Sequence, residues 1–103
     1  MAYTKEYLAQ ELTRAHVDTL PGLTLLEFGA KNCGHCAAIQ SALSAVLREH
    51  EAEHIKIEDG SGRLLGRSFK VKLWPTFVAM RDGQEVGRVV RPFTGGEIAA
   101  LLG

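Results

Sequence analysis

The apolar positions of the chain recur at spacings that change from helix-like to strand-like. Residues 4–16 place Leu8 and Leu12 at helical spacing, which predicts an amphipathic helix. Pro21-Gly22 then breaks the pattern, and the mostly apolar run 23–28 suits a strand covered on both faces. We therefore expect a helix followed by a buried strand.

A second helix and a second strand follow. From Cys36 to about Glu49 the apolar residues recur every three or four positions, which predicts a helix. Ile55 and Ile57 indicate a strand, and Asp59-Gly60-Ser61-Gly62 indicates a turn. Leu64, Leu65 and Phe69 belong to a shorter helix or an irregular crossover.

The C-terminal part carries a hairpin signal and a helix start. Residues 76–80 and 85–90 predict two strands joined by the turn 81–84. Thr94 with Glu97 forms a capping box ahead of a final helix. The full order is helix, strand, helix, strand, helix, strand, strand, helix. It predicts an α/β fold with a mixed sheet, in a single domain covering residues 1–103.

Composition and charge exclude several classes of protein. Hydrophobic residues make up 46% and charged residues 23%, as in ordinary globular domains. Twelve Lys and Arg offset twelve Asp and Glu, so nothing favours nucleic acid as a partner. No apolar run approaches the ~20 residues that span a bilayer. The first residues lack a secretion signal, so we expect a cytoplasmic protein, or a periplasmic one if the chain is a mature form. We also expect a monomer.

The only two cysteines, Cys33 and Cys36, stand three positions apart. Secreted domains held together by disulfides usually carry more cysteines, spread through the sequence. Closing so short a loop also constrains the unfolded chain little. The pair is therefore expected to do chemistry rather than to stabilise the fold.

The pair stands where a predicted strand ends and a helix begins. Three residues is almost one helical turn, so both sulfurs can lie on one side of the helix start. Cys33 then faces unsatisfied backbone N–H groups and the positive end of the helix dipole, which favour its thiolate. We expect Cys33 to be the nucleophile and Cys36, one turn inside, to resolve the mixed disulfide.

The two residues inside the pair affect access and redox balance. Gly34 gives the backbone of a partner close access to the sulfur. His35 can place a partly charged imidazole beside it, which stabilises the reduced form and makes the disulfide a stronger oxidant. The alternative for His35 is a solvated residue of the first helical turn. The other histidines are expected to be solvated residues of helices or loops: His16, His50 and His54.

Metal and haem attachment sites share the C-x-x-C spacing. Haem attachment needs His directly after the second Cys, where Ala37 stands. A structural zinc site needs four ligands, and His50 and His54 lie closer to the cysteines than a zinc-finger pattern places them. We therefore expect no metal within one chain. A metal that bridges two chains through Cys33 and Cys36 of each remains an alternative.

Four features together go beyond a bare motif: Glu27-Phe28, the Cys pair, Trp74-Pro75-Thr76 and the Asp82-Gly83 hairpin. In this order and spacing the chain resembles the thioredoxin family over nearly its whole length. The sequence Cys-Gly-His-Cys is similar to the active site of protein disulfide isomerase domains, whereas thioredoxins proper usually have Pro in place of His35. The resemblance implies a thioredoxin fold with a central mixed sheet of about four strands flanked by helices.

The resemblance also implies a substrate groove. Pro75 matches the cis-proline that lies against the active-site disulfide, and Thr76 follows it as in many family members. The bend would leave the backbone of Trp74 free to pair with an extended substrate segment. Arg91 and Pro92 stand near this groove, where thioredoxins carry Gly followed by a small residue.

The resemblance further implies a buried acid beneath the pair. Glu27 matches this acid, and its apolar strand context suits a group that accepts or returns the Cys36 proton. Lys56 roughly matches the lysine that often pairs with it. The family usually has an aromatic residue at Gly29 and Trp at Asn32, so this chain loses apolar surface around the active site.

These observations predict a thiol–disulfide oxidoreductase that acts on protein disulfides or dithiols. It would need no organic cofactor beyond the Cys33–Cys36 disulfide, and an electron donor such as a reductase or glutathione. His35 favours an oxidant or isomerase, whereas a reducing cytoplasm favours the reductase-like direction, which we prefer. The alternative is a binding module with incidental cysteines, anchored by Trp74, Arg91 and Phe93.

Overall fold

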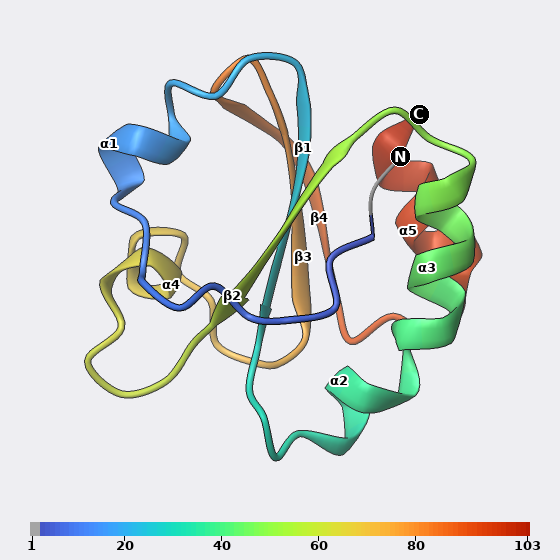
Figure 1. Cartoon of the computed structure of the whole chain (residues 1–103), viewed down its shortest axis with the longest axis horizontal. Helices are drawn as coiled ribbons and strands as arrows, with labels where there is room; N and C mark the ends of the chain where they lie inside the picture. Colours follow the sequence, from blue (N-terminus) through green and yellow to red (C-terminus); the bar gives the residue numbers. More distant parts are fainter. Residues whose placement is uncertain (1–2) are drawn as a thin grey trace.

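One mixed sheet of four strands forms the centre of the computed structural model, which describes residues 3–103 (Figure 1). Its strands are β1 (Leu23–Gly29), β2 (Glu53–Glu58), β3 (Thr76–Arg81) and β4 (Gln84–Val90). The order across the sheet is β2-β1-β3-β4, with β1 parallel to β2 and the other two pairs antiparallel. The predicted mixed four-stranded sheet is confirmed. Met1 and Ala2, which the single-domain prediction included, lie outside the described residues.

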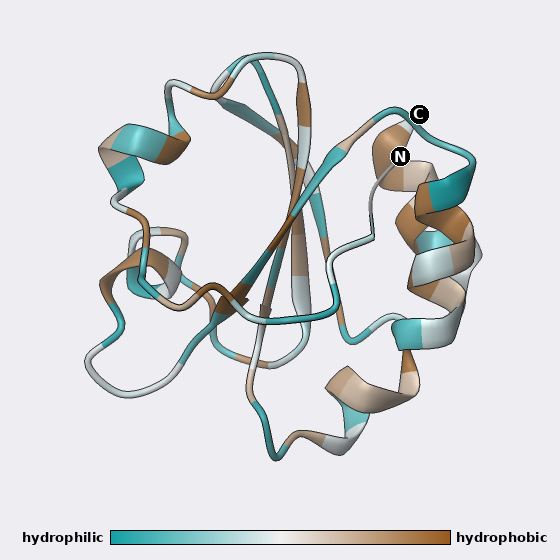
Figure 2. Ribbon diagram, in the orientation of Figure 1, coloured by the Kyte–Doolittle hydropathy of each residue, from teal (hydrophilic) through white to brown (hydrophobic). Residues whose placement is uncertain are grey.

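Helices cover both faces of the sheet. They are α1 (Arg14–Val17), α2 (Gly34–Ala38), α3 (Gln40–Arg48), α4 (Leu64–Ser68) and α5 (Gly95–Leu102). Apolar residues of α3 and α5 pack on one face, and those of α1 and α4 belong to a second cluster on the other (Figure 2). None of the helices within residues 3–103 combines the length and apolar character needed to cross a bilayer.

Strand alternation decides which side chains meet on the face that α3 covers. Ile55 and Ile57 of β2 pack into the cluster that contains residues of α1 and α4. Their neighbours His54 and Lys56 therefore point to the opposite face, because successive side chains of a strand alternate. Glu27 lies on that same face, opposite Lys56 in the parallel register. The alternation thus brings an acid, a histidine and a lysine together.

The two C-terminal signals in the sequence are confirmed. Asp82 and Gly83 form the β3–β4 turn with φ values of 52° and 82°. Positive φ at both central residues is what a two-residue hairpin of type I′ requires, and Asp-Gly suits it. The Thr94 hydroxyl accepts from the Glu97 N–H, and the Glu97 carboxylate accepts from the Thr94 N–H, which completes the capping box of α5.

The predicted helix over residues 4–16 is wrong, because only Arg14–Val17 is helical. The segment before it crosses β2 instead (Figure 1). The N–H of Leu8 donates to the carbonyl of Lys56 at 2.9 Å, and the hydroxyl of Thr4 donates to the carbonyl of His54 at 2.9 Å. The edge strand β2 has backbone carbonyls that would lack partners if residues 4–16 formed a helix. The N-terminal segment donates hydrogen bonds to them instead.

The predicted helix from Cys36 to Glu49 begins earlier and is divided. It starts at Gly34 and splits into α2 and α3 at Ile39. The side-chain amide of Gln40 donates to the carbonyl of Cys36 at 2.7 Å, and so takes the acceptor that a continuous helix would use. The short helix α2 therefore contains Cys36, and Cys33 is its N-cap residue.

Candidate active site

The two cysteines form a disulfide at the start of α2, with their Cα atoms 5.2 Å apart. Cys33 is the N-cap residue of α2, and its sulfur accepts a hydrogen bond from the N–H of Cys36 at 3.1 Å. Cys33 is half-buried, whereas Cys36 is only 3% exposed. A partner molecule can therefore approach the first sulfur and not the second.

A groove of about 530 Å³ lies beside Cys33. Its lining includes four residues that the sequence assigned to substrate binding: Gly34, His35, Trp74 and Arg91. Pro75 and Thr76 are buried, and the Trp74–Pro75 peptide bond is cis. The Thr76 hydroxyl donates to the carbonyl of Leu73 at 2.6 Å, so this residue supports the turn before β3.

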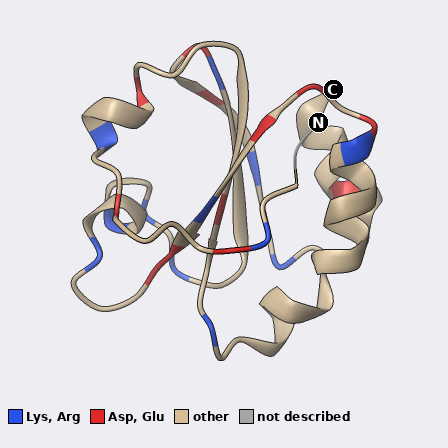
Figure 3. Cartoon of the chain, viewed as in Figure 1, with Lys and Arg blue, Asp and Glu red and all other residues tan. Residues whose placement is uncertain are grey.

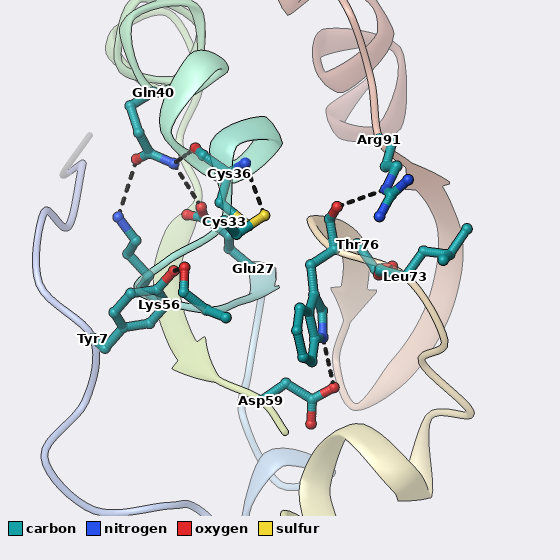
Figure 4. The surroundings of a disulfide bond; sticks show 12 residues. Tyr7, Glu27, Cys33, Cys36, Gln40, Lys56, Asp59, Leu73, Thr76 and Arg91 are labelled. Carbon is teal, nitrogen blue, oxygen red and sulfur yellow. Dashed lines mark hydrogen bonds between the residues drawn. A yellow bond between two sulfur atoms is a disulfide. The ribbon is translucent and has the colours of Figure 1, made fainter. Parts of the chain in front are cut away.

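The indole N–H and the main-chain carbonyl of Trp74 both form hydrogen bonds. Its indole Nε1–H donates to Oδ2 of Asp59 at 2.9 Å. Its carbonyl accepts from Nε of Arg91 at 2.8 Å. The sequence had suggested a free Trp74 backbone, but this carbonyl already has a partner. Arg91 adopts a φ of 50°, and its own N–H donates to the carbonyl of Pro75 at 2.8 Å. Figure 4 shows Arg91 on the side of the disulfide opposite Gln40 and Lys56.

Glu27 is completely buried beneath the disulfide, and both of its oxygens have partners. Oε2 accepts from Nε2 of Gln40 at 2.8 Å, and Oε1 lies 2.8 Å from Nε2 of His54. The ammonium of Lys56 instead donates to Oε1 of Gln40 at 3.1 Å and to the carbonyl of Lys5 at 3.0 Å. The expected direct pair of Lys56 with the acid is thus replaced by a link through Gln40.

His54 is buried, so the prediction of a solvated histidine is wrong. Its Nδ1 accepts from the N–H of Thr4 at 2.8 Å. Its ring stacks on Tyr3 with centroids 5.6 Å apart, and the Tyr3 hydroxyl donates to Oε1 of Gln40 at 2.6 Å. The N-terminal segment lies along the edge strand β2 and covers the side chain of His54, which explains why this side chain is buried.

Tyr7 fills the space left by Gly29. Its hydroxyl donates to the carbonyl of Ala30 at 3.1 Å. A Cβ at Gly29 would lie 2.8 Å from this hydroxyl and 3.0 Å from the sulfur of Cys36, so a larger residue fits here only if Tyr7 or Cys36 shifts. Burial, followed by the charges of Glu27 and Glu58, raises the pKa of Tyr7 to about 12.

Charges of both signs surround the site. Helix α2 carries no Lys, Arg, Asp or Glu (Figure 3). Lys31 and Arg63 each lie 4.0 Å from the carboxylate of Glu58, which borders the groove. Within residues 3–103, no three His, Cys, Asp or Glu side chains gather where they could hold a metal ion.

A protein-family model described as Thioredoxin matches residues 5–102. The chain belongs to the thioredoxin family. Thioredoxin H2-1 of Oryza sativa subsp. japonica is 32% identical over 81 residues, which are 78% of this chain and 58% of that protein. A thioredoxin of Staphylococcus aureus is 30% identical over 71 residues, which are 67% of this chain and 68% of that one. The chain thus spans less than two thirds of the length of the rice relative.

Solved thioredoxins share the fold. Thioredoxin 2 from Pseudomonas aeruginosa PAO1, in its reduced form, is 50% identical and has a TM-score of 0.83. The match covers 95% of this chain and 92% of that one. Thioredoxin NaTrxh from Nicotiana alata has a TM-score of 0.72 at 25% identity, covering 84% of this chain and 76% of that one. The predicted thioredoxin fold is confirmed.

Sequence reasoning missed three residues of this thioredoxin site: Gln40, His54 and Asp59. Gln40 stands one helical turn after Cys36, a spacing that places it beside the buried acid. His54 stands two positions before Lys56, so strand alternation could have placed both on one face. Asp59 gave no signal beyond a turn, because its partner Trp74 comes from a distant segment.

Proposed function

We propose that this thioredoxin-family chain is a thiol–disulfide oxidoreductase in which Cys33 attacks and Cys36 resolves. The observation that carries the proposal is the asymmetry of the pair. The sulfur of Cys33 caps α2 and borders an open groove, whereas Cys36 lies buried behind it. A reacting sulfur must meet its partner, and a resolving sulfur has only to reach its neighbour.

The reaction begins with the reduced pair. The N–H of Cys36, which points at the Cys33 sulfur, stabilises a thiolate there. This thiolate attacks one sulfur of a substrate disulfide, which forms a mixed disulfide and releases the other substrate sulfur as a thiolate. Cys36 then attacks the Cys33 sulfur, the bond from Cys33 to the substrate breaks, and the second substrate thiolate leaves. Two electrons pass from the pair to the substrate.

Cys36 must lose a proton before it attacks, and Glu27 is the proposed acceptor. Its carboxylate is buried beneath the pair and receives hydrogen bonds from Gln40 and from His54. Gln40 also binds the carbonyl of Cys36, so one amide holds the acid and the second cysteine together. Lys56 acts on the acid through the same amide.

The groove supports protein disulfides or dithiols as substrates. Gly34 leaves the sulfur of Cys33 uncovered, Trp74 offers a flat apolar wall, and His35 and Arg91 add polar contacts. Pro75 and Thr76 shape the turn that holds Trp74. We further propose a cytoplasmic monomer with reductase-like direction, supplied by an electron donor such as a reductase or glutathione, with no cofactor beyond its disulfide.

The equilibrium redox potential of the Cys33–Cys36 pair tests the proposal. The pair is equilibrated in dithiothreitol or glutathione buffers, and the alkylated species are counted by mass. A potential near that of reducing cytosolic dithiols supports the reductase direction, whereas a high potential supports an oxidant or isomerase. A pair that forms no disulfide in any buffer would overturn the proposed function.

The second candidate is a binding module. Phe93 is 85% exposed and follows Arg91, which borders the groove, so the rim offers an apolar anchor that the redox chemistry does not require. Substituting Cys33→Ser separates the two functions. A binding module keeps its partners after this substitution, whereas an oxidoreductase loses its activity.

A further inference from the structure

His54 contacts the buried acid, and the proposed reaction does not yet use it. Its Nε2 lies 2.8 Å from Oε1 of Glu27, and neither side chain is exposed to solvent. The residue stands on β2, and its neighbour Leu25 on β1 precedes Glu27 by two positions on the same face. A buried imidazole in contact with a carboxylate influences how readily that carboxylate takes up a proton, here the proton of Cys36.

The hydrogen bond to the other ring nitrogen decides the tautomer of His54. A backbone N–H can only donate, and the N–H of Thr4 points at Nδ1 from 2.8 Å. Nδ1 therefore carries a lone pair and no proton. The proton of the neutral ring must lie on Nε2, which donates to Glu27. The N-terminal segment thus determines that His54 donates a hydrogen bond to Glu27.

The second carboxylate oxygen of Glu27, Oε2, also accepts a hydrogen bond. Nε2 of Gln40 donates to Oε2, while Oε1 of Gln40 accepts from the Lys56 ammonium and the Tyr3 hydroxyl. These donors fix the orientation of the amide, because its oxygen must face them. Glu27 therefore accepts one hydrogen bond on each oxygen, and the two bonds fix the orientation of its carboxylate beneath the pair.

The remaining titratable groups around Glu27 lie on β2, on α2 and on the N-terminal segment. They are Lys56 on β2, Cys36 on α2, and Tyr3, Lys5, Glu6 and Tyr7 on the N-terminal segment. Burial, followed by the charges of Glu27 and Glu6, raises the pKa of Tyr3, and burial raises that of Tyr7 to about 12. Both phenols therefore stay neutral between pH 5 and pH 9.

We propose that His54 is a positioning residue for the resolving step, and that its Nε2–H holds Glu27 as the carboxylate that receives the Cys36 proton. This inference rests on the proposed function. In the step, the proton leaves the Cys36 thiol for Glu27 and afterwards passes to water. The Cys36 thiolate attacks the Cys33 sulfur, a disulfide forms, and the substrate leaves as a thiolate.

Single-turnover oxidation of the reduced protein by 5,5′-dithiobis(2-nitrobenzoate) separates the two steps. Attack by Cys33 releases one nitrothiolate, and resolution by Cys36 releases the second. Both phases are followed by stopped-flow absorbance from pH 5 to pH 9 in the unsubstituted protein and in His54→Leu and His54→Gln. Leu lacks the donor, whereas Gln keeps one N–H for Glu27 and one oxygen for the N–H of Thr4.

In His54→Leu, the pH at which the second phase reaches half its maximal rate rises by about one to two units. This is the shift expected from the loss of one hydrogen bond to a charged group. The first phase keeps its profile, and His54→Gln restores the second. If both phases of His54→Leu change alike, or neither changes, His54 is merely structural and the inference is wrong. If the unsubstituted protein releases only one nitrothiolate, as Cys36→Ser must, the proposed function fails as well.

Nitrogen NMR of the unsubstituted protein tests the tautomer without any variant. The two ring nitrogens of His54 resonate in separate regions according to which one carries the proton. We expect a protonated Nε2 and an unprotonated Nδ1 at neutral pH. A proton on Nδ1 would overturn the inference, whether or not His54→Leu folds.

Discussion

The carbonyl of Trp74 accepts a hydrogen bond from Nε of Arg91 at 2.8 Å, although the two residues lie 17 positions apart. An extended substrate that pairs with Trp74 would need this same acceptor. Arg91 directly follows β4, and its φ of 50° is a conformation that glycine adopts more readily. The arginine therefore occupies the acceptor that such a substrate backbone would use.

Substituting Arg91→Gly should free the acceptor. We expect the KM for an extended disulfide-containing peptide to fall about five-fold, since a net hydrogen bond contributes about 1 kcal/mol. Steady-state kinetics with such a peptide gives the value. Arg91→Lys is the matched control, because it keeps the charge without the Nε–H. An unchanged KM in Arg91→Gly would show that Trp74 does not bind substrate through this carbonyl.

Substituting Gly29→Ala should destabilise the fold. The added Cβ would lie 2.8 Å from the Tyr7 hydroxyl and 3.0 Å from the Cys36 sulfur, and overpacking of this kind costs about 1–3 kcal/mol. Urea unfolding measures the change. Gly34→Ala serves as the control, because its Cβ would meet no atom within 4 Å. Equal stability of the two variants would contradict the tight contact at Gly29.

The contact between Asp59 and Trp74 can be followed by fluorescence, because Trp74 is the only tryptophan. Asp59→Ala removes the acceptor of the indole N–H, so the ring should move and its emission maximum should shift. Asp59→Asn retains a side-chain oxygen and should preserve the spectrum. A spectrum of Asp59→Ala identical to that of the parent would show that Asp59 does not hold the ring.

Tyr7 links stability to alkaline pH. Burial is the main cause that raises its pKa to about 12, above the usual value of 10. The stability that its neutral form contributes is therefore complete below pH 10 and is lost as the pH rises from 10 to about 12. We expect the stability difference between the parent and Tyr7→Phe to shrink over this range in chemical unfolding. A difference independent of pH would mean that Tyr7 ionises normally.

Local patterns in the sequence predicted most of the secondary structure. Short apolar runs, turn residues and capping residues are properties of neighbouring positions, so the four strands, the Asp82-Gly83 hairpin and the capping box at Thr94 followed directly. The helix over residues 4–16 failed for the opposite reason. The segment binds the edge of β2 instead of forming a helix, and its hydrogen bond from Thr4 to His54 joins residues 50 positions apart.

The sequence by itself determined the reacting pair, because Cys33 and Cys36 are the only cysteines and their spacing at a helix start is a local property. Only the tertiary structure decided what surrounds them. The partners of Glu27, the tautomer of His54 and the hold of Arg91 on Trp74 all depend on contacts between distant segments. Residue spacing can place Gln40 and His54 on the right face, but it does not select their partners, because packing and hydrogen bonding choose among many partners only when the chain is folded.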